Sequence, residues 1–163
     1  IHCRGGIGRS GLMASCVVAG FVPTVEDALA RVGAARGCEV TGVDMNEAKI
    51  AAARKTYPGI RFLAGDILAV DLEREGFDTV VIAEVLEHVD EVTGDRMLAR
   101  AWECLRPGGR LVVSVPNEDL VPHRNHVRTF DRKAFRRLLS RWGTPRTVSE
   151  QPFPWLLMTV EKR

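Results

Sequence analysis

Short apolar runs alternate with longer amphipathic stretches along most of the chain. The apolar runs are rich in β-branched residues, as is typical of buried strands in a parallel sheet. The predicted strands cover residues 39–43, 61–64, 78–83, 110–115, 147–150 and 156–161. The predicted helices cover residues 25–35, 46–55, 93–105 and 131–142. This alternation predicts an α/β fold with a mostly parallel sheet. The last two strands have no helix between them and predict an antiparallel terminal hairpin.

Composition and charge describe an ordinary globular protein. The 163 residues are 45% hydrophobic and 27% charged, with a net charge of +2, which suits one domain with its own core. No apolar run approaches the roughly 20 residues that span a membrane, so we expect no membrane partner. The four cysteines lack C-x-x-C spacing, so we expect reduced thiols and a cytoplasmic protein. Because the chain begins with Ile1 and shows no signal peptide, we expect it to be the remainder of something longer.

Acidic residues follow two of the predicted strands. In open α/β sheets, ligands bind at the carboxyl ends of the strands. Asp44 could accept hydrogen bonds from both hydroxyls of a ribose, and Asp66 could accept one from an adenine amino group. Ile67, next to Asp66, could cover the adenine ring. Each acid could instead cap the helix that follows it.

Four segments, taken in order, resemble successive motifs of the class I S-adenosylmethionine-dependent methyltransferases. They are V-T-G-V-D at 40–44, F-L-A-G-D at 62–66, F-D-T-V-V-I-A-E-V-L-E-H-V at 77–89 and L-R-P-G-G-R-L-V-V-S-V-P-N at 105–117. The resemblance implies a Rossmann-like fold and S-adenosyl-L-methionine as the cofactor. It also implies methyl transfer to an acceptor, for which a small molecule is favoured. The implied cofactor-binding residues are Asp44, Met45, Asp66, Ile67 and Glu84.

The first strand and glycine loop of that family are not found where the resemblance places them. About 20 residues before the ribose-binding acid, the sequence reads A-G-F-V-P at 19–23 rather than G-x-G. The first strand is therefore missing or replaced, and we expect impaired cofactor binding. A central slot of the sheet would then lack a strand, although its backbone groups need partners. The run S-C-V-V-A at 15–19 is the expected filler, with the helix at 25–35 as the cofactor helix.

A second signature, H-C-x-x-x-x-x-R-S, covers residues 2–10. A cysteine nucleophile needs a lowered pKa, which the N-terminus of a following helix can provide. Arg9 could bind two phosphate oxygens, and Ser10 could donate a hydrogen bond to the departing sulfur. The segment resembles the cysteine-dependent protein tyrosine and dual-specificity phosphatases, which implies Cys3 as the nucleophile of a phosphocysteine intermediate. Residues 6–11 also fit G-x-G-x-x-G, a weaker alternative.

The two resemblances predict two units. Residues 1–37 form a partial phosphatase-like unit, and residues 38–163 form a methyltransferase domain without its glycine-loop strand. The junction could be a natural fusion, a recombined fragment or a designed chimera. Three functions stay open: a methyltransferase, a phosphatase acting on protein or aryl phosphates, and an inactive fusion fragment.

A cluster of acids and imidazoles leaves one further alternative open. Glu84, Glu87, His88 and either His123 or His126 could bind a divalent cation. This set resembles the small-RNA 3′-end 2′-O-methyltransferases, in which a metal holds the terminal hydroxyls. E-V-L-E-H at 84–88 also occurs in small-molecule methyltransferases that have no metal. We therefore assign no metal from the sequence, and we favour a small-molecule acceptor over a nucleic acid.

Overall fold

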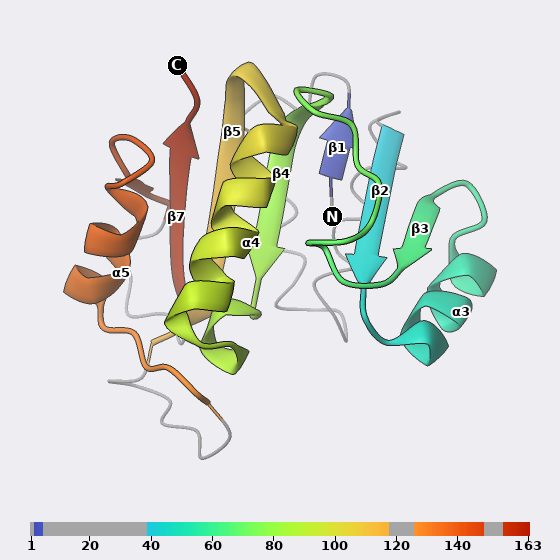
Figure 1. Ribbon diagram of the computed structural model, residues 1–163, viewed down its shortest axis with the longest axis horizontal. Coiled ribbons are helices and arrows are strands. Elements are labelled where there is room, and N and C mark those ends of the chain that lie inside the picture. Colours follow the sequence, from blue (N-terminus) through green and yellow to red (C-terminus); the bar gives the residue numbers. More distant parts are fainter. Residues whose placement is uncertain (1, 5–38, 118–125, 149–154) are drawn as a thin grey trace.

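The computed structural model describes the backbone of residues 2–4 and all atoms of residues 39–117, 126–148 and 155–163. Seven strands of these residues form one mixed sheet with the order β3-β2-β1-β4-β5-β7-β6 (Figure 1). The strands are β1 (His2–Arg4), β2 (Glu39–Asp44), β3 (Arg61–Ala64), β4 (Phe77–Ala83), β5 (Leu105–Pro116), β6 (Arg146–Thr147) and β7 (Trp155–Glu161). β2 pairs with β3 and β4 pairs with β5 in parallel, whereas β7 runs antiparallel to both β5 and β6. The predicted α/β fold with a terminal antiparallel hairpin is confirmed.

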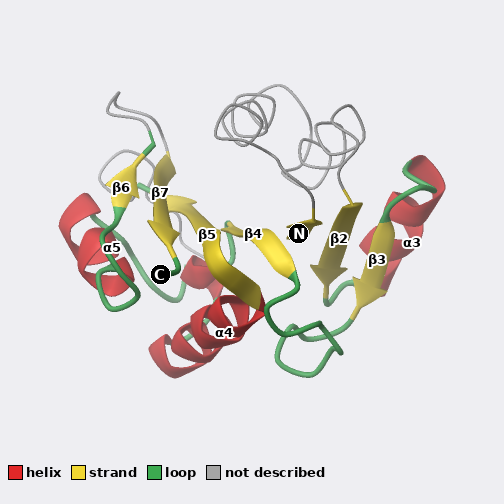
Figure 2. Cartoon of the chain, turned by 90° about the horizontal axis from the view of Figure 1, so that it is seen from above, coloured by secondary structure: helices red, strands yellow, loops and turns green. Residues whose placement is uncertain are grey.

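The described helices are α3 (Glu47–Thr56), the short 3-10 helix η1 (Leu86–His88), α4 (Glu91–Cys104) and α5 (Arg132–Leu139). Asn46, Asp90 and Asp131 cap the three α-helices, because each side chain accepts a hydrogen bond from the backbone N–H three residues later. α3 packs beside β2 and β3, α4 against β4 and β5, and α5 against β7 (Figure 2). Within the described part of the chain, every helix is too short or too polar to cross a lipid bilayer.

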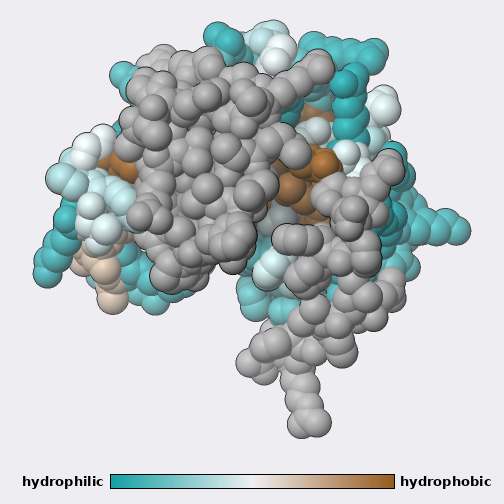
Figure 3. Space-filling model, turned by 180° about the vertical axis from the view of Figure 1, so that it is seen from behind, coloured by the Kyte–Doolittle hydropathy of each residue, from teal (hydrophilic) through white to brown (hydrophobic). Residues whose placement is uncertain are grey.

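The core lies between the sheet and helices α4 and α5. Val80, Leu98, Leu111 and Phe135 are fully buried there. At about 25 cal/mol for each Å² of apolar surface removed from water, such side chains supply most of the folding free energy. Seen from behind, the described residues are hydrophilic around the rim, and hydrophobic residues show near the middle of the face (Figure 3). The hydrophobic core described above lies on the face of the sheet that α4 covers.

The central slot of the sheet is filled by β1, which runs antiparallel to both of its neighbours. His2 lies opposite Thr41 of β2 and Val80 of β4. The expectation that residues 15–19 would fill this slot is wrong. Inner strand edges need backbone partners, and any extended segment can supply them whatever its side chains, so apolar composition was a poor guide. The expectation of a replaced first strand is confirmed.

The direction of β1 determines which edge of the sheet its ends reach. Arg4, the last residue of β1, lies opposite Glu39, the first residue of β2. Because β2 and β4 both run the other way, β1 ends at the edge where these strands begin. Arg4 therefore lies at the edge opposite to the one that carries Asp44.

The segment P-G-G at 107–109 lies within a bulged start of β5. Pairing with β4 passes from Leu105 opposite Phe77 to Arg110 opposite Thr79, so the strand register shifts between them. Gly108 has a φ of +78°, a backbone conformation that glycine adopts without strain. Its N–H donates to the carbonyl of Lys162, 2.7 Å away. The C-terminal segment thus holds the bulge in place.

The Lys162 side chain caps the C-terminal end of α4. Its Nζ donates hydrogen bonds to the carbonyl oxygens of Trp102 at 2.9 Å and Leu105 at 2.7 Å. It also lies 3.5 Å from a carboxylate oxygen of Glu75. No basic residue stands in the last turn of α4. Lys162 therefore supplies the positive charge that favours a helix C-terminus.

We expect Lys162→Met to lower the free energy of unfolding by about 1–3 kcal/mol, because two carbonyls lose a charged hydrogen-bond donor. Urea denaturation followed by circular dichroism measures this change. The matched control is Arg163→Met at the exposed next position, with an expected change within about 0.5 kcal/mol. Equal destabilisation by the two substitutions would contradict the capping role.

Candidate functional site

Asp44 and Asp66 lie at neighbouring strand tips, as the sequence predicts. Asp44 is the last residue of β2 and lies opposite Ala64, the last residue of β3. The N–H of Gly65 donates to the Asp44 carbonyl at 3.0 Å, so the chain turns tightly before Asp66. Gly65 has a φ of +147°, and a Cβ at this position would come within 2.9 Å of the Val70 side chain. A glycine is therefore required to present Asp66 beside Asp44.

The Asp44 carboxylate is only partly engaged within the protein. Its Oδ1 accepts a hydrogen bond from the backbone N–H of Asn46 at 2.7 Å. Its Oδ2 lies 3.9 Å from Nζ of Lys49, whose side chain is 69% exposed. An ion pair of this length with an exposed lysine contributes little. Asn46, and not Asp44, caps α3, so the alternative reading of Asp44 as a helix cap is wrong.

Asp66 and its neighbours form a short turn after β3. The Asp66 carbonyl accepts hydrogen bonds from the N–H groups of Ala69 and Val70, both at 2.9 Å. Oδ1 of Asp66 accepts one from the N–H of Leu68 at 2.9 Å, and the side chain is exposed. Ile67 is partly buried and packs against the core. Met45, which follows Asp44, is 75% exposed.

Glu84 follows β4 at the same edge of the sheet and is held by two other strands. Its φ is +52°, which is uncommon for a residue with a side chain and is often found at functional sites. Oγ of Ser114, on β5, donates to Oε1 of Glu84 at 2.7 Å. The side chain of Trp155, at the start of β7, also hydrogen-bonds Glu84. This arrangement fixes the position of the carboxyl group.

Burial raises the pKa of Glu84 to about 7, and the nearby Glu87 carboxylate adds to the rise. The hydrogen bonds from Ser114 and Trp155 and the proximity of His126 oppose it and lower the pKa. At neutral pH the carboxyl group is therefore divided between its protonated and charged forms. Such a group can accept or release a proton under physiological conditions.

Glu87, His88 and His126 come together just beyond Glu84. Nε2 of His88 lies 3.8 Å from Oε1 of Glu87, whose side chain is 1% exposed. The rings of His88 and His126 meet edge to face, with their centroids 5.2 Å apart. Of the two histidines that the sequence left open, His126 is placed in this cluster, and His123 lies outside the described residues.

Ser114 and Trp155 are site residues that the sequence reasoning missed. Ser114 had a signal, because it is a lone hydroxyl within the apolar run L-V-V-S-V-P at 111–116. A polar side chain in a buried strand needs a hydrogen-bond partner, and here the partner is Glu84. Trp155 had no such signal, since its contact with Glu84 depends on the pairing of β7 with β5.

The predicted phosphatase residues are placed only in part. The backbone of Cys3 belongs to β1 and lies opposite Val40 and Thr79. Arg9 and Ser10 lie outside the described residues. The phosphate-binding loop therefore stays a prediction. The end of β1 from which that loop starts is at the opposite edge of the sheet from Asp44, Asp66 and Glu84.

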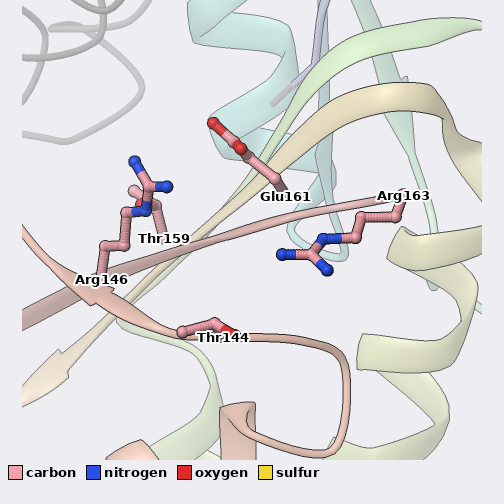
Figure 4. A pocket seen from close by; sticks show the side chains of 5 residues that line it. All are labelled: Thr144, Arg146, Thr159, Glu161 and Arg163. Atoms are coloured by element: carbon pink, nitrogen blue, oxygen red, sulfur yellow. The ribbon is translucent and has the colours of Figure 1, made fainter.

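A polar pocket lies at the far end of the strand order from Asp44 and Asp66 (Figure 4). It is lined by Thr144, Arg146, Thr159, Glu161 and Arg163. None of these five is a hydrophobic residue, and Glu161 is paired with Arg110 at 3.1 Å. The pocket therefore offers no apolar wall for a nucleoside base.

Comparison with known proteins places the chain among methyltransferases. Its curated relatives include a ubiquinone biosynthesis O-methyltransferase of Bradyrhizobium sp. (strain ORS 278), which is 39% identical over 87 residues. That alignment covers 51% of this chain and 33% of the relative. A ubiquinone/menaquinone biosynthesis C-methyltransferase of Methylobacterium nodulans is 32% identical over 129 residues, covering 65% of this chain and 50% of the relative. The chain thus spans about a third to a half of these relatives.

Solved structures show the same fold. The 1,6-didemethyltoxoflavin-N1-methyltransferase of Burkholderia thailandensis, crystallised with S-adenosylhomocysteine, has a TM-score of 0.68 and 22% identity. The match covers 94% of this chain and 78% of that structure. An S-adenosylmethionine-dependent methyltransferase of Archaeoglobus fulgidus has a TM-score of 0.69 and 12% identity, with 93% and 94% covered.

The family comparison identifies the domain directly. The profile described as "Methyltransferase domain" matches residues 26–109, which is about half of the chain. The match includes β2, β3, β4 and α4, and it begins within the helix that the sequence predicts at 25–35. It therefore covers both strand tips that carry Asp44 and Asp66, and it shows that this chain belongs to the methyltransferase domain family.

Proposed function

We propose that this chain is the cofactor-binding part of an S-adenosyl-L-methionine-dependent methyltransferase that acts on a small-molecule acceptor. The observation that carries the proposal is the pair of carboxylates at adjacent strand tips, Asp44 and Asp66. The relatives support it, since several are named as ubiquinone biosynthesis O-methyltransferases and one as a trans-aconitate 2-methyltransferase. For the methyl acceptor of this chain we propose only its class, a small molecule.

The residues at the two tips fit the nucleoside half of the cofactor. One oxygen of Asp44 is engaged by Asn46, and the other faces only the exposed Lys49, so a ribose diol can be bound. Asp66 is exposed and can accept a hydrogen bond from an adenine amino group. Met45 and Ile67, which follow the two acids, supply the apolar contacts for the ring.

The fit to the methionine half rests on fewer residues. β1 runs antiparallel to β2 and β4, so its carboxyl end lies at the opposite edge of the sheet from Asp44. We therefore expect weaker cofactor binding than in a chain with a parallel first strand and glycine loop. Residues 38–163 remain our proposal for the methyltransferase unit, with β1 contributed by the preceding segment.

The chemistry divides between the cofactor and the protein. The sulfonium of S-adenosyl-L-methionine supplies an electrophilic methyl group. Asp44 and Asp66 position the nucleoside, and Glu84 stands at the next tip of the sheet. Methylation of a hydroxyl or amine releases one proton, and the Glu84 carboxylate is placed to accept it.

The predicted cysteine phosphatase activity can be tested by experiment. Release of phosphate from an aryl phosphate ester, stopped by Cys3→Ser, would support that alternative. Among the described residues, none besides Cys3 belongs to the predicted phosphatase site.

Asp44→Asn should weaken the binding of S-adenosylhomocysteine at least tenfold, measured by isothermal titration calorimetry. The substitution keeps an oxygen for the Asn46 N–H but removes the negative charge that binds the ribose hydroxyls. Glu47→Gln, which neutralises an exposed carboxylate three residues further on, is the matched control and should bind normally.

Two results of this titration would contradict the proposed function. One is a chain that binds no S-adenosylhomocysteine at any accessible concentration. The other is an Asp44→Asn variant that binds as tightly as the unsubstituted chain.

Glu84→Gln should change how stability depends on pH. Between pH 4.5 and about 7 the folded state keeps the Glu84 proton that the unfolded state has lost, so Glu84 destabilises the fold as the pH rises through this window. Glutamine still accepts the Ser114 hydrogen bond but does not titrate. Relative to the unsubstituted chain, the variant should therefore gain about 1–3 kcal/mol between the two ends of the window.

Urea denaturation at a series of pH values, in EDTA, measures this gain. Glu91→Gln, which removes an exposed carboxylate at the start of α4, is the control for surface charge. A stability difference between Glu84→Gln and the unsubstituted chain that stays constant with pH would contradict the prediction.

A further inference from the structure

Three potential metal ligands from two separate segments converge beyond the tip of β4. Glu87 and His88 belong to η1, and His126 comes from the segment that leads into α5. One ligand atom from each lies within 4.8 Å of the other two. Ligand atoms of a tetrahedral zinc site are about 3.3 Å apart, given metal–ligand distances of about 2.0–2.2 Å. Zinc binding would therefore bring the ligand atoms closer together by up to about 1.5 Å.

The backbone fixes the two segments against each other. The Glu87 carbonyl accepts hydrogen bonds from the N–H of Val127 at 2.8 Å and from the N–H of Arg128 at 3.1 Å. His126 directly precedes these two residues. Its approach to Glu87 and His88 is therefore imposed by the main chain and does not depend on side-chain rotamers alone.

The electrostatic surroundings favour a cation. The Glu87 side chain is 1% exposed, and a carboxylate removed from water in this way needs positive charge nearby. Glu84 interacts electrostatically with both Glu87 and His126, so a second acid faces the cluster. The 52% exposed side chain of His88 gives an ion a path from solvent.

The donor set indicates the class of ion. Two imidazoles and one carboxylate suit Zn²⁺, Co²⁺, Ni²⁺ or Fe²⁺, whereas Mg²⁺ and Ca²⁺ prefer oxygen ligands alone. We propose that Glu87, His88 and His126 bind one divalent transition-metal ion, for which Zn²⁺ is the first choice. Three protein ligands leave a position open to water or to another ligand. The proposal does not depend on methyl transfer, and its test uses no cofactor.

The test is a titration of the whole chain with CoCl₂ after treatment with EDTA and dialysis. We expect one equivalent of Co²⁺ to give the visible absorption of a cobalt ion with nitrogen and oxygen ligands, and ZnCl₂ to abolish it. We also expect Zn²⁺ to raise the thermal midpoint, since the ion binds the folded state. The absence of stoichiometric Co²⁺ binding would overturn the proposal.

Two substitutions test the ligand set. His88→Ala and His126→Ala should each weaken Co²⁺ binding at least tenfold, because each removes one of three ligands. Glu91→Gln, an exposed acid near the cluster in sequence, should leave binding unchanged. Melting curves in EDTA verify that both histidine variants fold. Binding that survives either histidine substitution would overturn the three-ligand site and indicate attachment to other histidines.

Discussion

The need of the inner edges of β2 and β4 for backbone hydrogen-bond partners is the constraint on which the rest of the structure depends. Both strands lie inside the sheet, so their backbone groups must find partners there. β1 provides them with three residues, and it joins the half that carries Asp44 and Asp66 to the half that carries Glu84. The segment after Asp66 adds a second connection, since Arg100 on α4 donates to the carbonyls of Val70 and Leu72.

The elements after residue 38 could be predicted because their signals are local. β3 begins and ends at the predicted residues, and α3 and α5 begin within one residue of the predicted helix starts at 46 and 131. The positions of Asp44 and Asp66 followed from the rule that parallel strands bring their carboxyl ends to one edge. The predicted start of α4, at Thr93, is two residues too late. Asp90 caps the helix by accepting a hydrogen bond from the N–H of Thr93, so α4 begins at Glu91.

The remainder depended on contacts between residues distant in the sequence. Nothing in the three residues of β1 marks them as a strand, because their role comes from the slot that they enter. The bond between Ser114 and Glu84 requires the register of β4 against β5. The choice of His126 for the cluster requires the two hydrogen bonds to the Glu87 carbonyl. Composition and periodicity do not specify any of these pairings, although the lone hydroxyl of Ser114 in an apolar run indicates that it needs a partner.

The Glu87 carbonyl accepts two hydrogen bonds, and this has a consequence for the edge of the sheet at which Asp44, Asp66 and Glu84 lie. It joins η1 to the segment that enters α5, while the side chain of the same residue faces the two imidazoles. The backbone of Glu87 thus connects two segments, and its side chain belongs to the cluster with His88 and His126. A disturbance in how α5 meets the sheet would be transmitted to the alignment of Glu87, and substitutions on α5 can therefore tune this edge of the sheet.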